Sequence, residues 1–387
     1  MGNKSKKFST KCVHEGEIKD TMYQGIVSPL FMSTTYPWFG GDDPEKKPYP
    51  RYFNTPNQEF LSKKIASLEN GEKALIFTSG MAAISTSIMA NVKTGDHIVV
   101  QNDIYGGTRN FVLTEFDKFG IEYSFTDGLD PLNFSDQIKD NTVGIYLETP
   151  SNPLLKIVDL KSVSSIAKDN GVWTMIDNTF SSPVNQNPID HGIDIVLHSA
   201  TKYLGGHSDI SAGAVISTES RIEQILNSAK NFGGNLSDYT VWLLERSIKT
   251  LHIRVKEQTN NAKILAKMLD ENTNISKVYY PGLESHPSHE IAKSQMNDFG
   301  GMMSFDLNNN VDVYDFLKSL NLVKPGMSLA GVETTVNFPM KTSHGLMTQK
   351  ERDIQGIGDK LIRLSVGIES YEDIYEDLDQ AIKSSIK

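Results

Sequence analysis

The sequence contains a single cysteine, Cys12, and this scarcity excludes several kinds of site. One cysteine cannot form an intrachain disulfide, so nothing in the cysteine content argues for secretion, and a cytoplasmic protein is the expectation. A metal site built from thiolates is improbable for the same reason. We therefore expect no metal.

Long apolar runs and a basic charge balance are also missing. No apolar run approaches the roughly 18 to 20 residues that a membrane-spanning helix requires. The lysine-rich start, MGNKSKKFSTK, has no hydrophobic segment behind it, so neither a signal peptide nor a membrane anchor is predicted. The formal net charge of −10 argues against a nucleic-acid partner, because phosphate binding requires concentrated Lys and Arg.

What the sequence does contain is a regular alternation of short β-rich apolar runs and longer helix-like segments from about residue 73. We expect strands at residues 73–77, 97–101, 121–125, 144–148, 173–177, 194–197 and 213–217. Helical spacing occurs between several of them, for example at residues 81–92 and 160–170. Strands separated by helices predict an α/β fold with a mostly parallel sheet covered on both faces.

Three parts of the chain are expected. Residues 59–245 form a large domain, and residues 246–387 form a smaller C-terminal α/β domain with strand-like runs such as 302–307 and 361–366. Residues 1–58, rich in Pro, Tyr and Phe, are predicted to be an extended arm with little core of its own.

Chemically useful residues cluster where the predicted strands end, which is where parallel sheets bind ligands. Ser79-Gly80-Met81 lies at a strand-to-helix turn, where backbone N–H groups can bind an anion, although simple helix capping is the commoner role of such a turn. Ser199 and Thr201 offer two more hydroxyls for an anion. Asp177 ends another strand, and an aspartate in such a place is commonly a turn residue or a helix cap.

Lys202 follows the apolar run Ile195-Val196-Leu197 at the end of a strand. A charged amine is costly in such a place unless it is paired, neutralised or chemically used. A site for pyridoxal 5′-phosphate (PLP) needs three groups: an anion-binding turn for the phosphate, a carboxylate that pairs with the protonated ring nitrogen, and an amine that forms a Schiff base. The residues named here offer all three.

A family resemblance makes this interpretation specific. The stretch DIVLHSATKYLGGHS, residues 194–208, resembles the cofactor-attachment signature of the Cys/Met-metabolism PLP enzymes, which include cystathionine γ-synthase, cystathionine β- and γ-lyases, methionine γ-lyase and acylhomoserine sulfhydrylases. Further blocks resemble the family in the expected order: YGGT at 105–108, ETPSNP at 148–153, IDNTF at 176–180, YYPGL at 279–283 and LIRLSVGIE at 361–369. The resemblance implies the PLP-dependent transferase fold (fold type I).

The resemblance also implies roles for individual residues. Lys202 would bind the cofactor covalently and later transfer protons, Asp177 would pair with the ring nitrogen, and Tyr105 would stack on the ring, which makes these three the catalytic residues. Arg363 would hold the substrate α-carboxylate, a task suited to a bidentate guanidinium, with Ser328 nearby. The remaining cofactor contacts would come from Gly80, Met81, Ser199 and Thr201 at the phosphate, and from Asn152, which would also lie near the substrate.

In the family, a Tyr-x-Arg pair from a neighbouring subunit completes the phosphate site. Tyr49-Pro50-Arg51 matches this pattern, which would explain an arm without a core. We therefore expect an oligomer, minimally a dimer that shares two active sites, and the resemblance implies a homotetramer formed as a dimer of dimers.

The reaction is less sharply defined by the sequence. Methionine γ-lyases typically carry a cysteine where this chain has Gly107, and cystathionine γ-synthases and γ-lyases commonly carry a glutamate where it has Met327. We expect a carbon–sulfur lyase that cleaves cystathionine by elimination. The alternatives are a cystathionine γ-synthase or O-acylhomoserine sulfhydrylase acting by γ-replacement, an aminotransferase, and a binding protein with an inactive PLP site.

Overall fold

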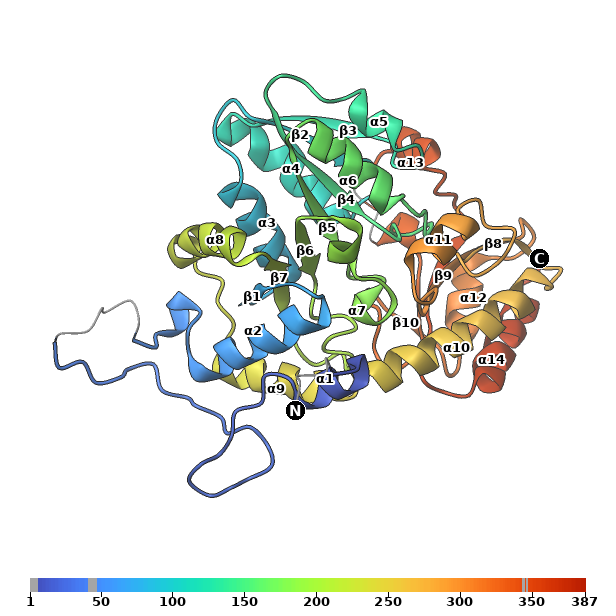
Figure 1. The fold of residues 1–387 in the computed structure, drawn as a ribbon. Helices are drawn as coiled ribbons and strands as arrows, with labels where there is room; N and C mark the ends of the chain where they lie inside the picture. Colours follow the sequence, from blue (N-terminus) through green and yellow to red (C-terminus); the bar gives the residue numbers. More distant parts are fainter. Residues whose placement is uncertain (1–5, 41–46, 343–344, 346) are drawn as a thin grey trace.

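The computed structural model describes residues 6–40, 47–342, 345 and 347–387, and its main feature is a seven-stranded sheet (Figure 1). Its strand order is β1-β7-β6-β5-β4-β2-β3. The strands are β1 (Lys73–Phe77), β2 (His97–Gln101), β3 (Glu122–Thr126), β4 (Thr142–Glu148), β5 (Trp173–Asp177), β6 (Ile195–His198) and β7 (Gly213–Ser217). Strand β7 is antiparallel to both of its neighbours, and all other pairs are parallel, which confirms the expected mostly parallel sheet.

Helices cover both faces of this sheet, because its central strands are apolar on both sides. In β6, Val196 packs into one buried cluster and Ile195 and Leu197 pack into another on the opposite face. The helices of this part are α2 (Pro56–Leu68), α3 (Gly80–Ala90), α4 (Gly106–Phe119), α5 (Leu132–Ser135), α6 (Leu160–Asp169), α7 (Ser182–Asn185), α8 (Glu219–Phe232) and α9 (Asp238–Ile248). Helices α2, α6 and α9 contribute to the Val196 cluster, whereas α3, α4 and α8 contribute to the other.

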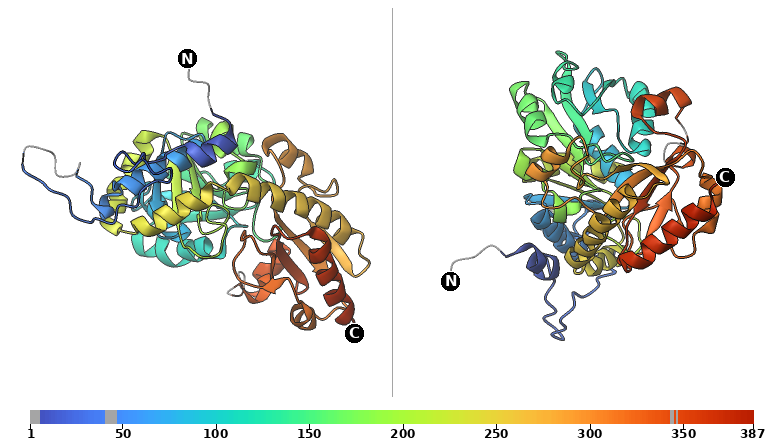
Figure 2. Two further views of the ribbon diagram at one scale, coloured as in Figure 1. Left: turned by 90° about the horizontal axis from the view of Figure 1, so that it is seen from below. Right: turned by 90° about the vertical axis from the view of Figure 1, so that its right-hand side faces the viewer.

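A second, five-stranded sheet of order β10-β11-β12-β9-β8 forms the C-terminal part. Its strands are β8 (Ile275–Tyr279), β9 (Met302–Leu307), β10 (Lys324–Pro325), β11 (Thr335–Asn337) and β12 (Leu361–Ser365), and its helices are α10 (Leu251–Asp270), α11 (His289–Gln295), α12 (Val313–Ser319), α13 (Gln349–Gln355) and α14 (Tyr371–Ser384). Residues of α10, α12 and α14 pack with this sheet in one buried cluster. Figure 2 shows the long α10 running from the large part of the molecule into this smaller one. The expected smaller α/β unit is therefore present.

The N-terminal segment is less uniform than the expected extended arm. Helix α1 (Phe8–His14) is docked, since Cys12 is fully buried and Lys64 of α2 donates hydrogen bonds to the carbonyls of Cys12 and Val13 at 3.0 and 3.2 Å. Residues 17–39 contain no helix or strand and run along the outside (Figure 1). Parts of the predicted arm, residues 1–5 and 41–46, lie outside the described residues. The domain boundaries at residues 58 and 245 stay predictions.

The predicted elements differ from the observed ones mainly at their ends. Helices α9 and α10 follow each other closely, with only Lys249 and Thr250 between them. Across the part of the chain that the structure describes, no helix is both long and apolar enough to cross a membrane. Within the described ranges, short 3₁₀ turns also occur at Pro50–Tyr52, Pro188–His191 and Pro339–Lys341.

Candidate active site

A cavity of about 270 Å³ lies beyond the carboxyl ends of β1, β4, β5 and β6. Most of the residues predicted from the sequence line it. Its wall is formed by Ser79, Gly80, Met81, Ile84, Tyr105, Glu148, Asn152, Asp177, Thr179, Phe180, Ser199, Thr201, Lys202, Met327, Leu329 and Arg363. Most of its polar groups come from the ends of strands in the large sheet. Met327 and Leu329 come from the segment between β10 and β11 of the smaller sheet, and Arg363 comes from β12.

The N-terminus of α3 forms one end of the cavity. Ser79 caps the helix, because its hydroxyl accepts a hydrogen bond from the backbone N–H of Ala82 at 3.1 Å. A Cβ atom on Gly80 would lie 2.8 Å from Cβ of Ser199, so only glycine lets the helix start approach the Ser199 loop this closely. The hydroxyl of Thr201 bonds to the backbone of Ala212, which fixes the same loop. Free helix N–H groups beside hydroxyls suit a phosphate.

Lys202 points into the cavity from the loop after β6. Its ammonium group donates a hydrogen bond to the hydroxyl oxygen of Ser328 at 2.8 Å. Burial first, and the positive charge of Arg363 second, together lower the pKa of Lys202 from 10.5 to about 8. A lysine with a lowered pKa is a better nucleophile at neutral pH, as Schiff-base formation requires.

Two carboxyl groups lie side by side in the cavity. Glu148 and Asp177 end the neighbouring strands β4 and β5 and are direct partners in their register, and both are buried. Burial raises the pKa of both groups, and the negative charge of Asp177 raises that of Glu148 further. Oε2 of Glu148 accepts a hydrogen bond from the backbone N–H of Tyr105 at 2.7 Å, and Oδ1 of Asp177 accepts one from the N–H of Thr179 at 3.0 Å. Glu148 thus fixes the Tyr105 loop.

Arg363 reaches the cavity from β12 and is 2% exposed, so it is not a solvated surface charge. Its Nη1 donates to Oδ1 of Asn152 at 3.0 Å, and its Nη2 donates to the carbonyl of Ser328 at 3.3 Å. Among the described residues, none accepts a hydrogen bond from its Nε, although this atom is buried. Burial lowers the pKa of Arg363 to about 10. A buried guanidinium with unused hydrogen-bonding capacity suits an anionic ligand.

Tyr105 stands at the open side of the cavity, with 42% of the residue exposed. It precedes α4, and the absence of a side chain at Gly107 makes room for its ring. A Cβ atom on Gly107 would lie 2.5 Å from Cε1 of Tyr105 and 3.2 Å from the sulfur of Met81. A larger residue at position 107 therefore requires the Tyr105 ring to move.

Tyr49 and Arg51 are not among the residues that line the cavity. Tyr49 is exposed, and Arg51 donates a hydrogen bond to the carbonyl of Lys230 at 2.8 Å. The Arg51 guanidinium also lies over the rings of Tyr49 and Tyr52, at 5.6 and 5.1 Å from their centroids. Within this single chain, the pair therefore contributes nothing to the cavity wall.

Several residues of the cavity were missed by sequence reasoning. Glu148 and Thr179 belong to motifs quoted from the sequence, and their positions at strand ends could have identified them. Phe180 also lies in a quoted motif, whereas Ile84 and Leu329 carry only apolar side chains, so no sequence signal separates these two from core residues.

Comparison with known proteins agrees with this geometry. Residues 9–383 match the family described as Cys/Met metabolism PLP-dependent enzyme. The chain belongs to this family. It is 42% identical over 379 residues to a cystathionine β-lyase of Lactococcus lactis subsp. cremoris (strain MG1363), which covers 97% of this chain and 99% of that protein. It is 40% identical over 379 residues to a cystathionine γ-lyase of Bacillus subtilis (strain 168), covering 98% and 100%.

Solved structures of the family superpose closely. The cystathionine γ-lyase from Lactobacillus plantarum complexed with L-serine has a TM-score of 0.94 at 37% identity, covering 98% of this chain and 99% of that one. A cystathionine γ-synthase from Xanthomonas oryzae pv. oryzae in complex with cystathionine has a TM-score of 0.95 at 35% identity, covering 99% of both chains. The expected PLP-dependent transferase fold is confirmed.

Membership in the Cys/Met metabolism family makes the protein a PLP-dependent enzyme of sulfur amino acid metabolism. The cavity fits the cofactor. It combines the Lys202 amine of lowered pKa, the Asp177 carboxyl group at the end of β5, and the start of α3, where Gly80 lets the Ser199 loop come close.

Proposed function

We propose that this protein is a cytoplasmic, PLP-dependent carbon–sulfur lyase that cleaves cystathionine by elimination. One observation carries the proposal: Lys202, Asp177 and Arg363 line a single cavity whose distal wall carries Met327 in place of a charged residue. PLP supplies an electron-withdrawing ring that stabilises negative charge at the substrate α-carbon.

Lys202 would hold the cofactor and move protons. Its lowered pKa provides a neutral amine near neutral pH, and its hydrogen bond to Ser328 directs the amine within the cavity. Asp177 would keep the ring nitrogen protonated, and Tyr105 would cover the ring. Gly80, Met81, Ser199 and Thr201 would surround the phosphate, where the helix start favours negative charge.

Arg363 would bind the α-carboxylate of the substrate. Its contacts with Asn152 and Ser328 fix the guanidinium plane, and its buried Nε retains a hydrogen atom to donate. Asn152 would therefore act both on the substrate side and near the cofactor. A lysine could not replace this planar pair of donors.

The distal wall of the cavity bears on the choice of reaction. Met327 and Leu329 are both apolar, so they offer no charge to the distal ammonium of cystathionine or to an incoming cysteine. Such a wall favours a lyase with broad tolerance for the leaving thiol. Relatives named cystathionine β-lyase and cystathionine γ-lyase are consistent with it.

Cystathionine γ-synthase is the second candidate. Its support is the likeness to a relative named cystathionine γ-synthase/O-acetylhomoserine (thiol)-lyase, 38% identical over 379 residues, and to γ-synthase structures at a TM-score of 0.95. Gly107 argues against methionine γ-lyase, because those enzymes typically carry a cysteine at this position, and in this chain a side chain there would require the Tyr105 ring to move.

The N-terminal arm supports a homotetramer built as a dimer of dimers. Exposed apolar side chains gather on it, and they would be covered by a neighbouring subunit: Met22, Tyr23, Ile26, Val27, Met32, Trp38 and Phe39. Tyr49 and Arg51 would then reach the phosphate of the partner's cofactor.

Product analysis tests the reaction. Cystathionine alone should give either pyruvate, homocysteine and ammonia by β-elimination, or 2-oxobutyrate, cysteine and ammonia by γ-elimination, and mass spectrometry distinguishes the two. In a second incubation an O-acylhomoserine and cysteine are supplied. Efficient formation of cystathionine with negligible breakdown would overturn the lyase assignment in favour of the synthase.

A further inference from the structure

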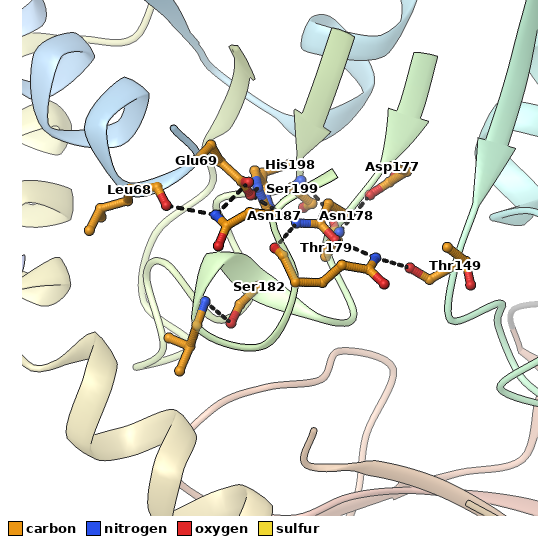
Figure 3. Close-up of polar contacts among 12 residues, drawn as sticks. Leu68, Glu69, Thr149, Asp177, Asn178, Thr179, Ser182, Asn187, His198 and Ser199 are labelled. Atoms are coloured by element: carbon orange, nitrogen blue, oxygen red, sulfur yellow. Dashed lines mark hydrogen bonds and ion pairs between the residues drawn. The ribbon is translucent and has the colours of Figure 1, made fainter. Parts of the chain in front are cut away.

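A buried ion pair lies next to the strand ends that carry the active site (Figure 3). It joins Glu69, the residue that follows α2, to His198, the last residue of β6, with Nε2 of His198 2.5 Å from Oε1 of Glu69. The two side chains are 0% and 2% exposed. None of the cavity chemistry described above uses either of them.

The other partners of Glu69 define its state. Oε1 also accepts a hydrogen bond from the amide of Asn178 at 2.8 Å, and Oε2 accepts one from the amide of Asn187 at 3.2 Å. Both oxygens therefore act as acceptors, as in an ionised carboxylate, so the imidazole of His198 is the donor in the short contact. A buried carboxylate needs hydrogen-bond donors or an opposite charge close by, and its described ion-pair partner is His198.

This pair is connected to Asp177 from two directions. Asn178, which touches Glu69, directly follows Asp177, and its backbone N–H donates to the carbonyl of Leu197 at 2.9 Å, next to His198. On the other side, the N–H of Ser199 donates to the hydroxyl of Thr179 at 2.8 Å, and the N–H of Thr179 donates to Asp177. The residues on both sides of His198 thus hold the residues that follow Asp177.

Asp177 needs such support because its surroundings oppose a negative charge. Burial raises its pKa, while the hydrogen bonds of Thr179 and the positive charge of His198 lower it. Glu148, a second buried carboxyl, is its partner on the neighbouring strand. If the carboxyl bound a proton more tightly than the cofactor's ring nitrogen does, it would take the proton itself and leave the ring neutral.

We propose that His198, held by Glu69, is a positioning residue that keeps Asp177 oriented and anionic toward the ring nitrogen of the cofactor. The inference rests on the proposed role of Asp177. His198 does not line the cavity. It would act on Asp177 through the hydrogen bonds between the ends of β5 and β6 and through its charge.

The test compares the affinities of the apoprotein for two ligands: PLP, and an analogue in which carbon replaces the ring nitrogen. The ratio of the dissociation constant of PLP to that of the analogue isolates the interaction with the ring nitrogen, because both ligands share the phosphate and the aldehyde. We expect His198→Gln and Glu69→Gln each to weaken PLP binding about tenfold, the effect of a change of about one unit in a coupled pKa. Binding of the analogue should change less than about twofold.

The matched control is Asn187→Ala, which removes a different contact of Glu69 and leaves the His198 contact in place. It should leave the ratio unchanged. Circular dichroism and the Tm of each apoprotein check the fold, and the milder Glu69→Gln replacement serves if His198→Gln does not fold. Equal weakening of both ligands, or an unchanged ratio in both the His198 and Glu69 variants, overturns the proposal.

Asp177→Asn separates this inference from the proposed function. If it raises the ratio of the PLP to the analogue dissociation constant while the His198 and Glu69 variants do not, Asp177 is the ring partner and only the inference about His198 fails. If Asp177→Asn itself leaves the ratio unchanged, the proposed role of Asp177 fails, and the inference fails with it.

Discussion

The ammonium group of Lys202 lies 2.8 Å from the hydroxyl of Ser328, although 126 positions separate the two residues in the sequence. Lys202 follows β6 of the large sheet, and Ser328 lies between β10 and β11 of the small one. The contact places the amine at the junction of the two sheets, where Arg363 of β12 also donates to the carbonyl of Ser328. One loop of the smaller sheet therefore orients both the amine and the guanidinium.

Replacement of Lys202 by Ala should abolish turnover and leave the fold intact, because the loss is chemical. PLP should then bind only non-covalently, and the visible absorbance band of the parent enzyme should disappear. Ser328→Ala is the matched control, since it keeps the amine and removes its hydrogen bond. It should retain the band and lower kcat at least about tenfold, because a hydrogen bond to a charged group contributes about 1.5 to 3 kcal/mol. Turnover near the parent rate in Lys202→Ala would refute the assignment.

The lowered pKa of Lys202 predicts how the apoprotein takes up PLP as the pH changes. Only the neutral amine reacts with the aldehyde, and its fraction rises as the pH rises through the pKa. Because that pKa is lowered to about 8, the rate of reconstitution should rise to a plateau with a midpoint of about 8. About one tenth of the amine is then neutral at pH 7, against about one in 3,000 for an ordinary lysine.

Arg363→Met should move this midpoint to higher pH, because the guanidinium no longer opposes the ammonium form. Stopped-flow absorbance across pH 6.5 to about 10.5 measures both profiles. A parent rate that still rises steeply above pH 10 would show that Lys202 behaves as an exposed lysine.

Much of this site could be predicted from the sequence, because its polar residues follow apolar strands directly. Asp177, Ser199 and Lys202 are fixed by the ends of β5 and β6, and strand ends are readable from composition. The large sheet was predictable for the same reason, with errors of one or two residues at strand ends such as Glu122–Thr126.

Contacts between distant segments were not predictable. The sequence does not reveal that Glu69 meets His198, since 129 positions separate them and the contact depends on how α2 packs on the sheet. The packing of α1 through Lys64 is a second example, because a buried lysine has no periodic signal. The proposed sharing of the site through Tyr49 and Arg51 involves a second subunit, which no single chain contains.

Hybrid oligomers test the shared site. Arg51→Ala and Lys202→Ala should each be inactive as pure proteins, yet mixing equal amounts after reversible dissociation should restore activity. One site of each hybrid dimer combines an intact Lys202 with an intact Arg51 from the partner. With random pairing, about a quarter of the parental activity should return.

The control for this experiment mixes Lys202→Ala with Asp177→Asn. Both lesions lie in the cavity of a single chain, so no hybrid contains an intact site and activity should stay absent. Recovery in this control, or full activity of a monomer in sedimentation at assay concentration, would contradict sharing of the site between subunits.

The distal wall of the cavity gives a specificity prediction. Met327 lines the cavity and is 78% exposed, so a charged side chain can be accommodated there without a cost of burial. Met327→Glu should lower KM for cystathionine about fivefold, because a partly exposed ion pair with the distal ammonium contributes about 1 kcal/mol. KM for a thioether substrate without a distal ammonium should not fall. Met327→Gln has the same shape without the charge, and it should leave the ratio of the two KM values close to that of the parent. Steady-state kinetics on both substrates decide the matter: if Met327→Glu changes the two KM values equally, residue 327 does not face the distal end of the substrate.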